Sequence, residues 1–156
     1  RHDAPRADSA ANPAQAPEGA DGGAPWTAVA ATQFHELVAA TLGAAARRGV
    51  VPLLRAPVQP VAAAEVGAAV ADAAERDPLG RITTVAGPEA VDLRDLARAW
   101  RDVTGSRAAP VRVPLPGALG RALRAGGLTD PHPDVRGTTA FRDWLAAQHA
   151  ERAAAR

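Results

Sequence analysis

His35 and Glu36 stand next to each other, as in the zinc-binding pattern His-Glu-x-x-His. A zinc site of that kind needs a second histidine four residues after the first, because this spacing places both imidazoles on one face of a helix. Position 39 is instead Ala39. The pattern is incomplete, and we expect no metal here.

A second group of possible ligands lies nearer the C-terminus. Asp130, His132 and Asp134 are separated only by Pro131 and Pro133. The prolines favour a stiff turn, and no fourth ligand is near in the sequence. We therefore expect a solvated loop rather than a metal site.

Two glycines, Gly117 and Gly120, follow an extended segment and open a predicted helix, as in a loop that cradles phosphate. A dinucleotide-binding loop requires a third glycine, where this chain has Leu123. Pro114 and Pro116 also interrupt the preceding strand. A turn that starts the helix explains the two glycines better.

No side chain is placed as a nucleophile. Ser9 and Ser106 both lie outside a Gly-x-Ser-x-Gly elbow, and the chain contains no cysteine. It also contains no tyrosine, and all 18 of its basic residues other than histidine are arginine. A mechanism that uses a tyrosine acid beside a lysine is therefore excluded, and the sequence predicts no catalytic residue.

The charge pattern argues against a nucleic-acid partner. The net charge is only +1, and arginines alternate with acids along the helical stretches, whereas nucleic-acid binding needs clustered positive charge. No apolar run approaches the ~20 residues of a membrane-spanning helix, so no membrane partner is expected. The absence of cysteine fits a reducing, cytoplasmic location. The sequence does not predict the oligomeric state.

Three regions are expected along the chain. Residues 1–24 have no apolar side chain larger than alanine, so burial cannot offset their ordering entropy and we expect a disordered tail or an unrelated upstream segment. Residues 25–150 form the domain, and residues 151–156 a frayed tail. Within the domain, apolar residues at helical spacing follow short β-rich segments, and this alternation predicts an α/β fold. Strands are expected at 26–31, 50–54, 57–61, 81–86 and 111–115, the first of them buried. Helices are expected around 34–48, 66–76, 93–104, 117–125 and 141–148. Gly49 and Gly105 are stop signals, and the inward faces include Val70 in one helix and Leu96, Ala97 and Trp100 in another.

Four segments of this domain resemble, in order, the NmrA-like atypical short-chain dehydrogenases. PWTAVAATQFHELV (25–38) is similar to the family's segment in which a Rossmann strand ends and a helix begins at the cofactor and substrate. PVQPVAAAEVGAAVADAA (57–74) resembles the strand and helix that usually carry Asp-Val-Ala. RITTVAGPEAVDLRDLARAW (81–100) resembles a strand, Gly-Pro-Glu and a helix. VRVPLPGALGRALRAGGLT (111–129) resembles the region that shapes the substrate side.

The resemblance covers roughly residues 25–148, with two departures. Glu65–Val66–Gly67 replaces Asp-Val-Ala, and the family's glycine-rich first strand, turn and helix have no counterpart. The resemblance thus implies the C-terminal part of a Rossmann-like, doubly wound α/β sheet with a small substrate-side subdomain, the N-terminal nucleotide-binding half being missing. It implies NAD(P) as cofactor, at a site that this chain leaves incomplete, and a small-molecule substrate for the intact parent.

Ligands of open α/β sheets lie beyond the carboxyl ends of the strands. On this basis Thr32, Gln33 and Phe34 are predicted to bind the cofactor, and His35, Gln59 and Pro60 the substrate. Alternatives stay open for three of them. Thr32 is equally a candidate to cap the following helix, Phe34 to join the core, and His35 to lie exposed at the helix start.

Three functions follow. The first is the substrate-side portion of an NAD(P)-dependent oxidoreductase, inactive alone. The second is a non-catalytic NAD(P)-sensing regulator of the NmrA type, which the absence of tyrosine and lysine suits. The third is a truncated gene product without activity.

Overall fold

The computed structural model describes residues 25–155 of the chain. The expectation of disorder for residues 1–24 falls outside these described residues. Strands and helices alternate through the described part, which confirms the predicted α/β class. The strands are β1 (Ala28–Ala31), β2 (Val50–Leu53), β3 (Pro57–Val58), β4 (Ile82–Ala86), β5 (Val91–Asp92), β6 (Ala109–Arg112) and β7 (Val135–Arg136). The helices are α1 (His35–Ala46), α2 (Ala63–Glu75), α3 (Leu93–Thr104), α4 (Gly117–Arg124) and α5 (Phe141–Ala154).

Two added strands and several element boundaries differ from the prediction. Helix α2 begins at Ala63 rather than around residue 66, β3 ends at Val58 rather than 61, and β6 spans Ala109–Arg112 rather than 111–115. The short strands β5 and β7 were not expected, because two residues are too few to show a period. Helix α5 continues to Ala154, so the frayed tail predicted from residue 151 is wrong. Alanine and arginine are among the best helix formers, which explains the extension. No helix among residues 25–155 is long and apolar enough to cross a bilayer.

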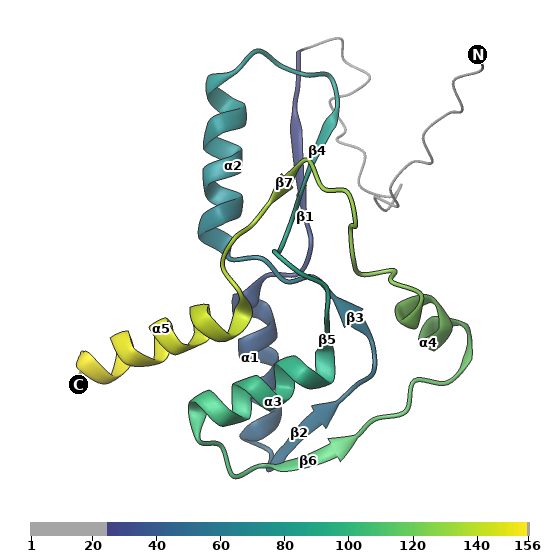
Figure 1. The fold of residues 1–156 in the computed structure, drawn as a ribbon, viewed down its shortest axis with the longest axis vertical. Coiled ribbons are helices and arrows are strands. Elements are labelled where there is room, and N and C mark those ends of the chain that lie inside the picture. Colours follow the sequence, from purple (N-terminus) through teal and green to yellow (C-terminus); the bar gives the residue numbers. More distant parts are fainter. Residues whose placement is uncertain (1–24, 156) are drawn as a thin grey trace.

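The sheets are small and mostly parallel. Strands β1, β4 and β7 form one parallel sheet in the order β1-β4-β7, and β2 pairs with β6 in parallel. Of the strands in residues 25–155, only β3 and β5 pair antiparallel. Figure 1 shows α2 beside the β1-β4-β7 sheet, with α1, α3, β2 and β6 gathered at the opposite end of the molecule.

Strand β1 lies at the edge of its sheet. Within the described residues it pairs only with β4, from Ala28 opposite Ile82 to Ala31 opposite Val85. Its residues are half-buried or exposed, so the prediction of a buried strand at 26–31 is wrong. Parallel strands are normally buried on both faces. The apolar sequence of β1 fits that arrangement, but its surroundings here do not provide it.

The hydrophobic core lies at the other end of the molecule, where α1, α3, α5 and β2 meet. The predicted inward face of α3 is confirmed, since Leu96, Ala97 and Trp100 are buried. The cluster consists of Val38, Leu42, Val51, Val58, Leu96, Ala97, Trp100, Phe141 and Leu145. Asp92 starts α3 by accepting a 3.1 Å hydrogen bond from the Arg94 amide, and Gly105 ends it in a left-handed conformation.

Helix α2 contributes little to this core. It has no buried residue, and Val70, predicted to face inward, is 48% exposed. The helix packs against β1 in a sheet only three strands wide, and most of its side chains are alanine, which bury little area. The α2 side of the molecule is therefore thinly covered.

Two leucines of α1, one buried and one exposed, test whether the core described here stabilises the fold. Leu42 is 3% exposed and Leu37 is 59% exposed. Replacing Leu42 with alanine leaves a cavity in the core, and we expect the free energy of unfolding to fall by about 2–4 kcal/mol. Leu37→Ala, the matched control on the same helix, is expected to change it by less than ~0.5 kcal/mol. Urea unfolding followed by circular dichroism measures both, and equal losses would contradict this placement of the core.

Candidate functional site

The loops that follow β1 and β3 meet at the carboxyl end of β1. The Thr32 hydroxyl donates a short hydrogen bond to the backbone carbonyl of Gln59. The backbone N–H of Gln59 donates to Gln33 Oε1 at 3.4 Å. Val61 N donates to the Gln33 carbonyl at 2.9 Å. The structure thus brings together Thr32, Gln33 and Gln59, which the sequence placed in two separate clusters.

The side chain of Gln59 is enclosed and holds two other segments in place. It is 2% exposed, its Nε2 donates to the Gly87 carbonyl, and its Oε1 accepts from the Asp130 amide, both at 2.9 Å. Both ends of the amide are therefore used within the protein. The prediction of a solvated loop at residues 130–134 is wrong at Asp130, which is 8% exposed because this bond draws it inward.

Gly87 is required at this junction for steric reasons. A Cβ atom at this position would lie 1.8 Å from the Pro60 carbonyl oxygen, which belongs to rigid backbone. Only glycine allows the end of β4 to approach the segment after β3 so closely. The Gly-Pro-Glu that begins at residue 87 thus has a packing role in this structure.

The structure excludes two alternatives for the residues that start α1. The residue preceding this helix is Phe34, and no side chain caps it, so Thr32 is not its capping residue. Phe34 is 36% exposed and does not belong to the core. Its ring is available to solvent at the carboxyl end of β1.

His35 is fully buried, so the alternative of an exposed histidine at the helix start is wrong. Its Nε2 lies 2.9 Å from the carbonyl oxygen of Thr139 and carries the proton, since a carbonyl only accepts. Its ring centroid is 5.5 Å from that of Phe141 and 5.4 Å from that of Trp144. Nδ1 is buried and makes no hydrogen bond within the described residues.

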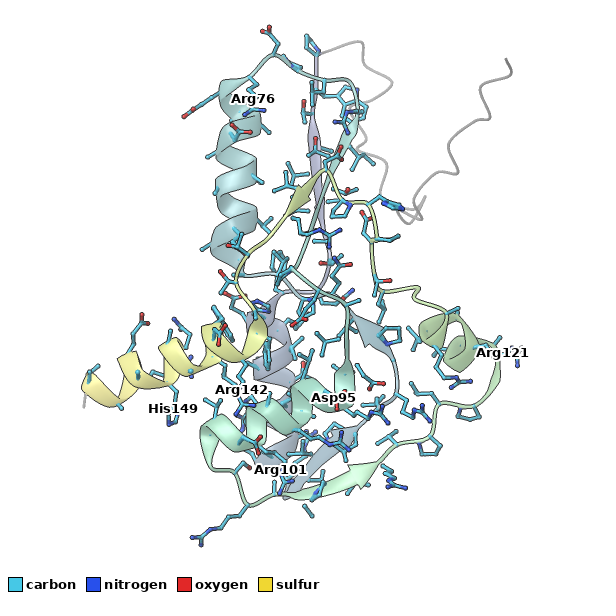
Figure 2. The ribbon with its side chains drawn as sticks, viewed as in Figure 1. Arg76, Asp95, Arg101, Arg121, Arg142 and His149 are labelled. Atoms are coloured by element: carbon cyan, nitrogen blue, oxygen red, sulfur yellow. The ribbon has the colours of Figure 1, made fainter. Side chains whose placement is uncertain are left out.

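Pro60 lines a small cavity of about 110 Å³. Leu96 and Phe141 contribute apolar surface to it, and Asp95 and Arg142 contribute charge. Figure 2 labels these last two residues on α3 and α5. His35, Gln59 and Pro60, the residues predicted to bind substrate, are all buried, and of the three Pro60 lines this cavity.

Glu65 accepts four hydrogen bonds that the sequence did not predict, and we call this set the Glu65 latch. Its Oε1 accepts from the backbone amides of Thr138 and Thr139 at 2.7 and 3.2 Å and from their hydroxyls at 3.0 and 3.2 Å. Partial burial, the largest single influence, raises the pKa of Glu65, but the four hydrogen bonds together outweigh it and lower the pKa below 4.5. The carboxylate ties the start of α2 to the segment before α5.

Asp134 makes a second such connection, between β4 and the start of β7. Its Oδ2 accepts from the Thr84 amide at 2.8 Å, and its Oδ1 pairs with Arg81 at 2.9 Å. The bond from Thr84 is the main cause of a lowered pKa for Asp134; partial burial opposes the shift and Arg81 supports it. Sequence reasoning found the acid but had no means of finding its partners, fifty residues away.

The two glycines around the start of α4 match the helix-start turn rather than a phosphate loop. Gly117 begins α4 with a positive φ of 76°, as expected of a helix-start turn. Gly120 is needed because a Cβ there would lie 1.8 Å from the Leu115 carbonyl oxygen. Across residues 25–155, no group of three or more histidine, cysteine or acidic side chains is arranged to hold a metal ion.

Comparison with solved structures identifies the fold. An NADPH-dependent quinone oxidoreductase from Escherichia coli superposes with a TM-score of 0.63 at 20% identity, over 83% of this chain and 57% of its own. A nucleoside-diphosphate-sugar epimerase from Staphylococcus aureus superposes with a TM-score of 0.60 at 13% identity, over 81% and 53%. A dTDP-glucose 4,6-dehydratase from Bacillus anthracis, in complex with NAD, gives 0.53 at 12% identity, over 81% and 44%.

The fold is therefore α/β of the Rossmann-like type. The chain spans about half the length of the structures it matches. No protein-family model and no curated protein matches its sequence. At such identities the likeness establishes the fold alone.

The Glu65 latch predicts a defined pH dependence of stability. A carboxyl whose pKa is lower in the folded state stabilises the protein above its unfolded pKa, and this contribution is lost as the pH falls through the folded value. We expect Glu65→Gln to lower the free energy of unfolding by about 1 kcal/mol at pH 7. The difference from the unmodified chain should shrink below pH 4.5. Urea unfolding from pH 7 to pH 3 measures this.

The matched control is Glu75→Gln, at the exposed end of the same helix. It removes the same charge without any hydrogen bond to Thr138 or Thr139, so its effect should stay near zero at every pH. A Glu65→Gln effect that is constant from pH 7 to pH 3 would show that the carboxylate charge is not what matters.

Proposed function

We propose that this chain is the substrate-side portion of an NAD(P)-dependent oxidoreductase of the NmrA-like, atypical short-chain dehydrogenase type. The observation that carries the proposal is the open edge of β1. A half-buried parallel strand with one partner calls for a second strand alongside it and for cover on both faces. A nucleotide-binding half supplies both. The matched structures, of which this chain covers 57% and 53%, have room for such a half.

The residues present fit the nicotinamide ring of a dinucleotide but not its pyrophosphate. Beyond the carboxyl end of β1, the exposed ring of Phe34 and the half-buried Thr32 and Gln33 offer an apolar face beside polar groups, which suits a nicotinamide ring. A pyrophosphate needs a glycine-rich turn that opens onto a helix N-terminus. No such turn occurs in residues 25–155. When bound, the cofactor supplies hydride transfer, and no step of that reaction is assigned to this chain.

On the substrate side, we assign the buried Pro60, which lines the cavity of about 110 Å³, to the wall that a ligand would meet, with the buried His35 and Gln59 as its supporting residues. The enclosed amide of Gln59 fixes the position of Pro60 through Gly87 and Asp130. His35 fixes the start of α5 through Thr139. These two residues would shape the substrate site by holding its walls.

A non-catalytic NAD(P)-sensing regulator is the second candidate. The absence of both tyrosine and lysine favours it, because the usual proton-donating pair of a short-chain dehydrogenase cannot come from this chain. Both functions would involve NAD(P) binding, but only the oxidoreductase would also oxidise or reduce the bound cofactor.

The proposal predicts that NADPH binding requires the rest of the sheet. Residues 1–156 alone should give no saturable change in NADPH fluorescence. The chain extended by its preceding coding sequence should bind NADPH with a micromolar dissociation constant. Oxidation of bound NADPH by a panel of quinones and carbonyl compounds would indicate the enzyme, and binding without oxidation the regulator. Micromolar binding by residues 1–156, or no glycine-rich loop encoded upstream in any frame, would contradict the proposal.

Phe34 and Leu37 provide a matched pair within the extended chain. Both are exposed and apolar, but only Phe34 lies at the carboxyl end of β1. Phe34→Ala should weaken NADPH binding about fivefold through loss of aromatic contact, and Leu37→Ala should leave it unchanged.

A further inference from the structure

Helices α1, α3 and α5 enclose a groove of about 300 Å³ that the proposed function does not use. We propose that this groove binds a small aromatic anion, such as an arene carboxylate, at a site separate from the cofactor. We call it the three-helix groove, and its defining residues are Ala39, Gly43, Arg47, Trp100, Trp144 and Arg152.

The walls combine flat aromatic surface with little obstruction. Trp144 of α5 and the 8% exposed Trp100 of α3 line the groove, and α1 presents the small residues Ala39, Ala40 and Gly43 opposite them, together with Glu36. Small residues keep the space between the helices open, and indole faces favour planar apolar ligands. A volume near 300 Å³ is at the lower end of small-molecule sites and suits a ligand of two fused rings.

Gly43 marks the point where apolar and cationic groups meet. A carbon atom attached there would lie 3.8 Å from Cζ2 of Trp100 and 3.9 Å from Nη1 of Arg47. These are ordinary contact distances. A ligand atom at this place would therefore touch an aromatic ring and a guanidinium together, which is the combination that an aromatic acid requires.

The charge in the groove is predominantly positive. Arg47 and Arg152 line it with His149, against a single carboxylate, Glu36. Both oxygens of Glu36 are already 3.3–3.4 Å from the Ala63 amide. Within residues 25–155, neither Arg47 nor Arg152 forms an ion pair. Figure 2 shows His149 on the side of α5 that faces α3.

The cationic end of the groove, at Arg47, is remote from the predicted cofactor edge, although Glu36 lines its other end beside His35. Helix α1 starts at His35, beside the carboxyl end of β1, and runs for 12 residues to Ala46. At 1.5 Å per residue, Arg47 lies about 18 Å along the axis from that edge. A ligand held by Arg47 and Trp100 would therefore occupy a second site.

The test uses 2-naphthoate as the probe and the full chain. The chain has three tryptophans, of which Trp100 and Trp144 line the groove and Trp26 does not, so each indole N–H signal reports its own place. In ¹H–¹⁵N spectra, 2-naphthoate should shift the signals of Trp100 and Trp144 in a saturable way and leave that of Trp26 in place. The uncharged analogue 2-naphthamide should bind at least ~5-fold more weakly.

Two matched pairs of variants locate the site. Arg47→Ala should weaken 2-naphthoate binding about fivefold, whereas Arg48→Ala, its exposed neighbour outside the groove, should not. Gly43→Ala places a methyl group at the contact point and should weaken binding while favouring the helix. Gly67→Ala on α2, where a Cβ meets nothing within 4 Å, is its control.

Several results would overturn the proposal. They are the absence of saturable shifts, equal affinity for 2-naphthamide, and equal effects of the Arg47 and Arg48 variants. A fourth is shifts that depend on protein concentration together with a dimer in sedimentation velocity, which would make a second copy the occupant. None of these outcomes bears on NADPH binding at β1, so this inference and the proposed function fail independently.

Discussion

The parallel pairing of β1 with β4 is the constraint on which the rest of this structure depends. Parallel strands are normally covered on both faces, and a strand with an unpaired edge leaves a row of backbone groups without a protein partner. β1 has one partner within the described residues and is half-exposed, and α2 beside it buries none of its side chains. The core lies instead around α1, α3 and α5. Among the described residues, the molecule therefore has a packed core at one end and a thinly covered sheet at the other.

The two ends are joined by a compact set of hydrogen bonds centred on Gln59. Its buried amide connects the end of β4 with the loop at Asp130, while its carbonyl receives the Thr32 hydroxyl. Glu65 and Asp134 hold the segment from residue 134 to residue 139 against α2 and β4. This network orders the carboxyl end of β1, where a Rossmann-like fold binds its ligands. It also explains why Thr32 and Gln59, whose polar side chains could bind a ligand, instead form hydrogen bonds that hold backbone segments in place.

The sequence was sufficient for the alternation of strands and helices, since the apolar periods of α3 and α5 and the stop signals at Gly49 and Gly105 are local properties. It was insufficient for burial. His35 looked exposed or ligand-facing but is enclosed by Phe141 and Trp144, more than a hundred residues away. Asp130 looked solvated but is drawn inward by Gln59. The bonds of Glu65 and the two-residue strands β5 and β7 depend on long-range pairing, which no local pattern encodes.

Amide hydrogen exchange along β1 tests the open edge most directly. The amides of Ala28 and Thr32 donate to β4, so the alternation of a strand directs the amide of Ala30 to β4 as well and those of Val29 and Ala31 to the free edge. In the isolated chain, NMR should show slow exchange at Ala30 and Thr32 and exchange near the rate of an unfolded peptide at Val29 and Ala31. Equal protection of all four amides would show that the edge of β1 is already paired and would contradict the account.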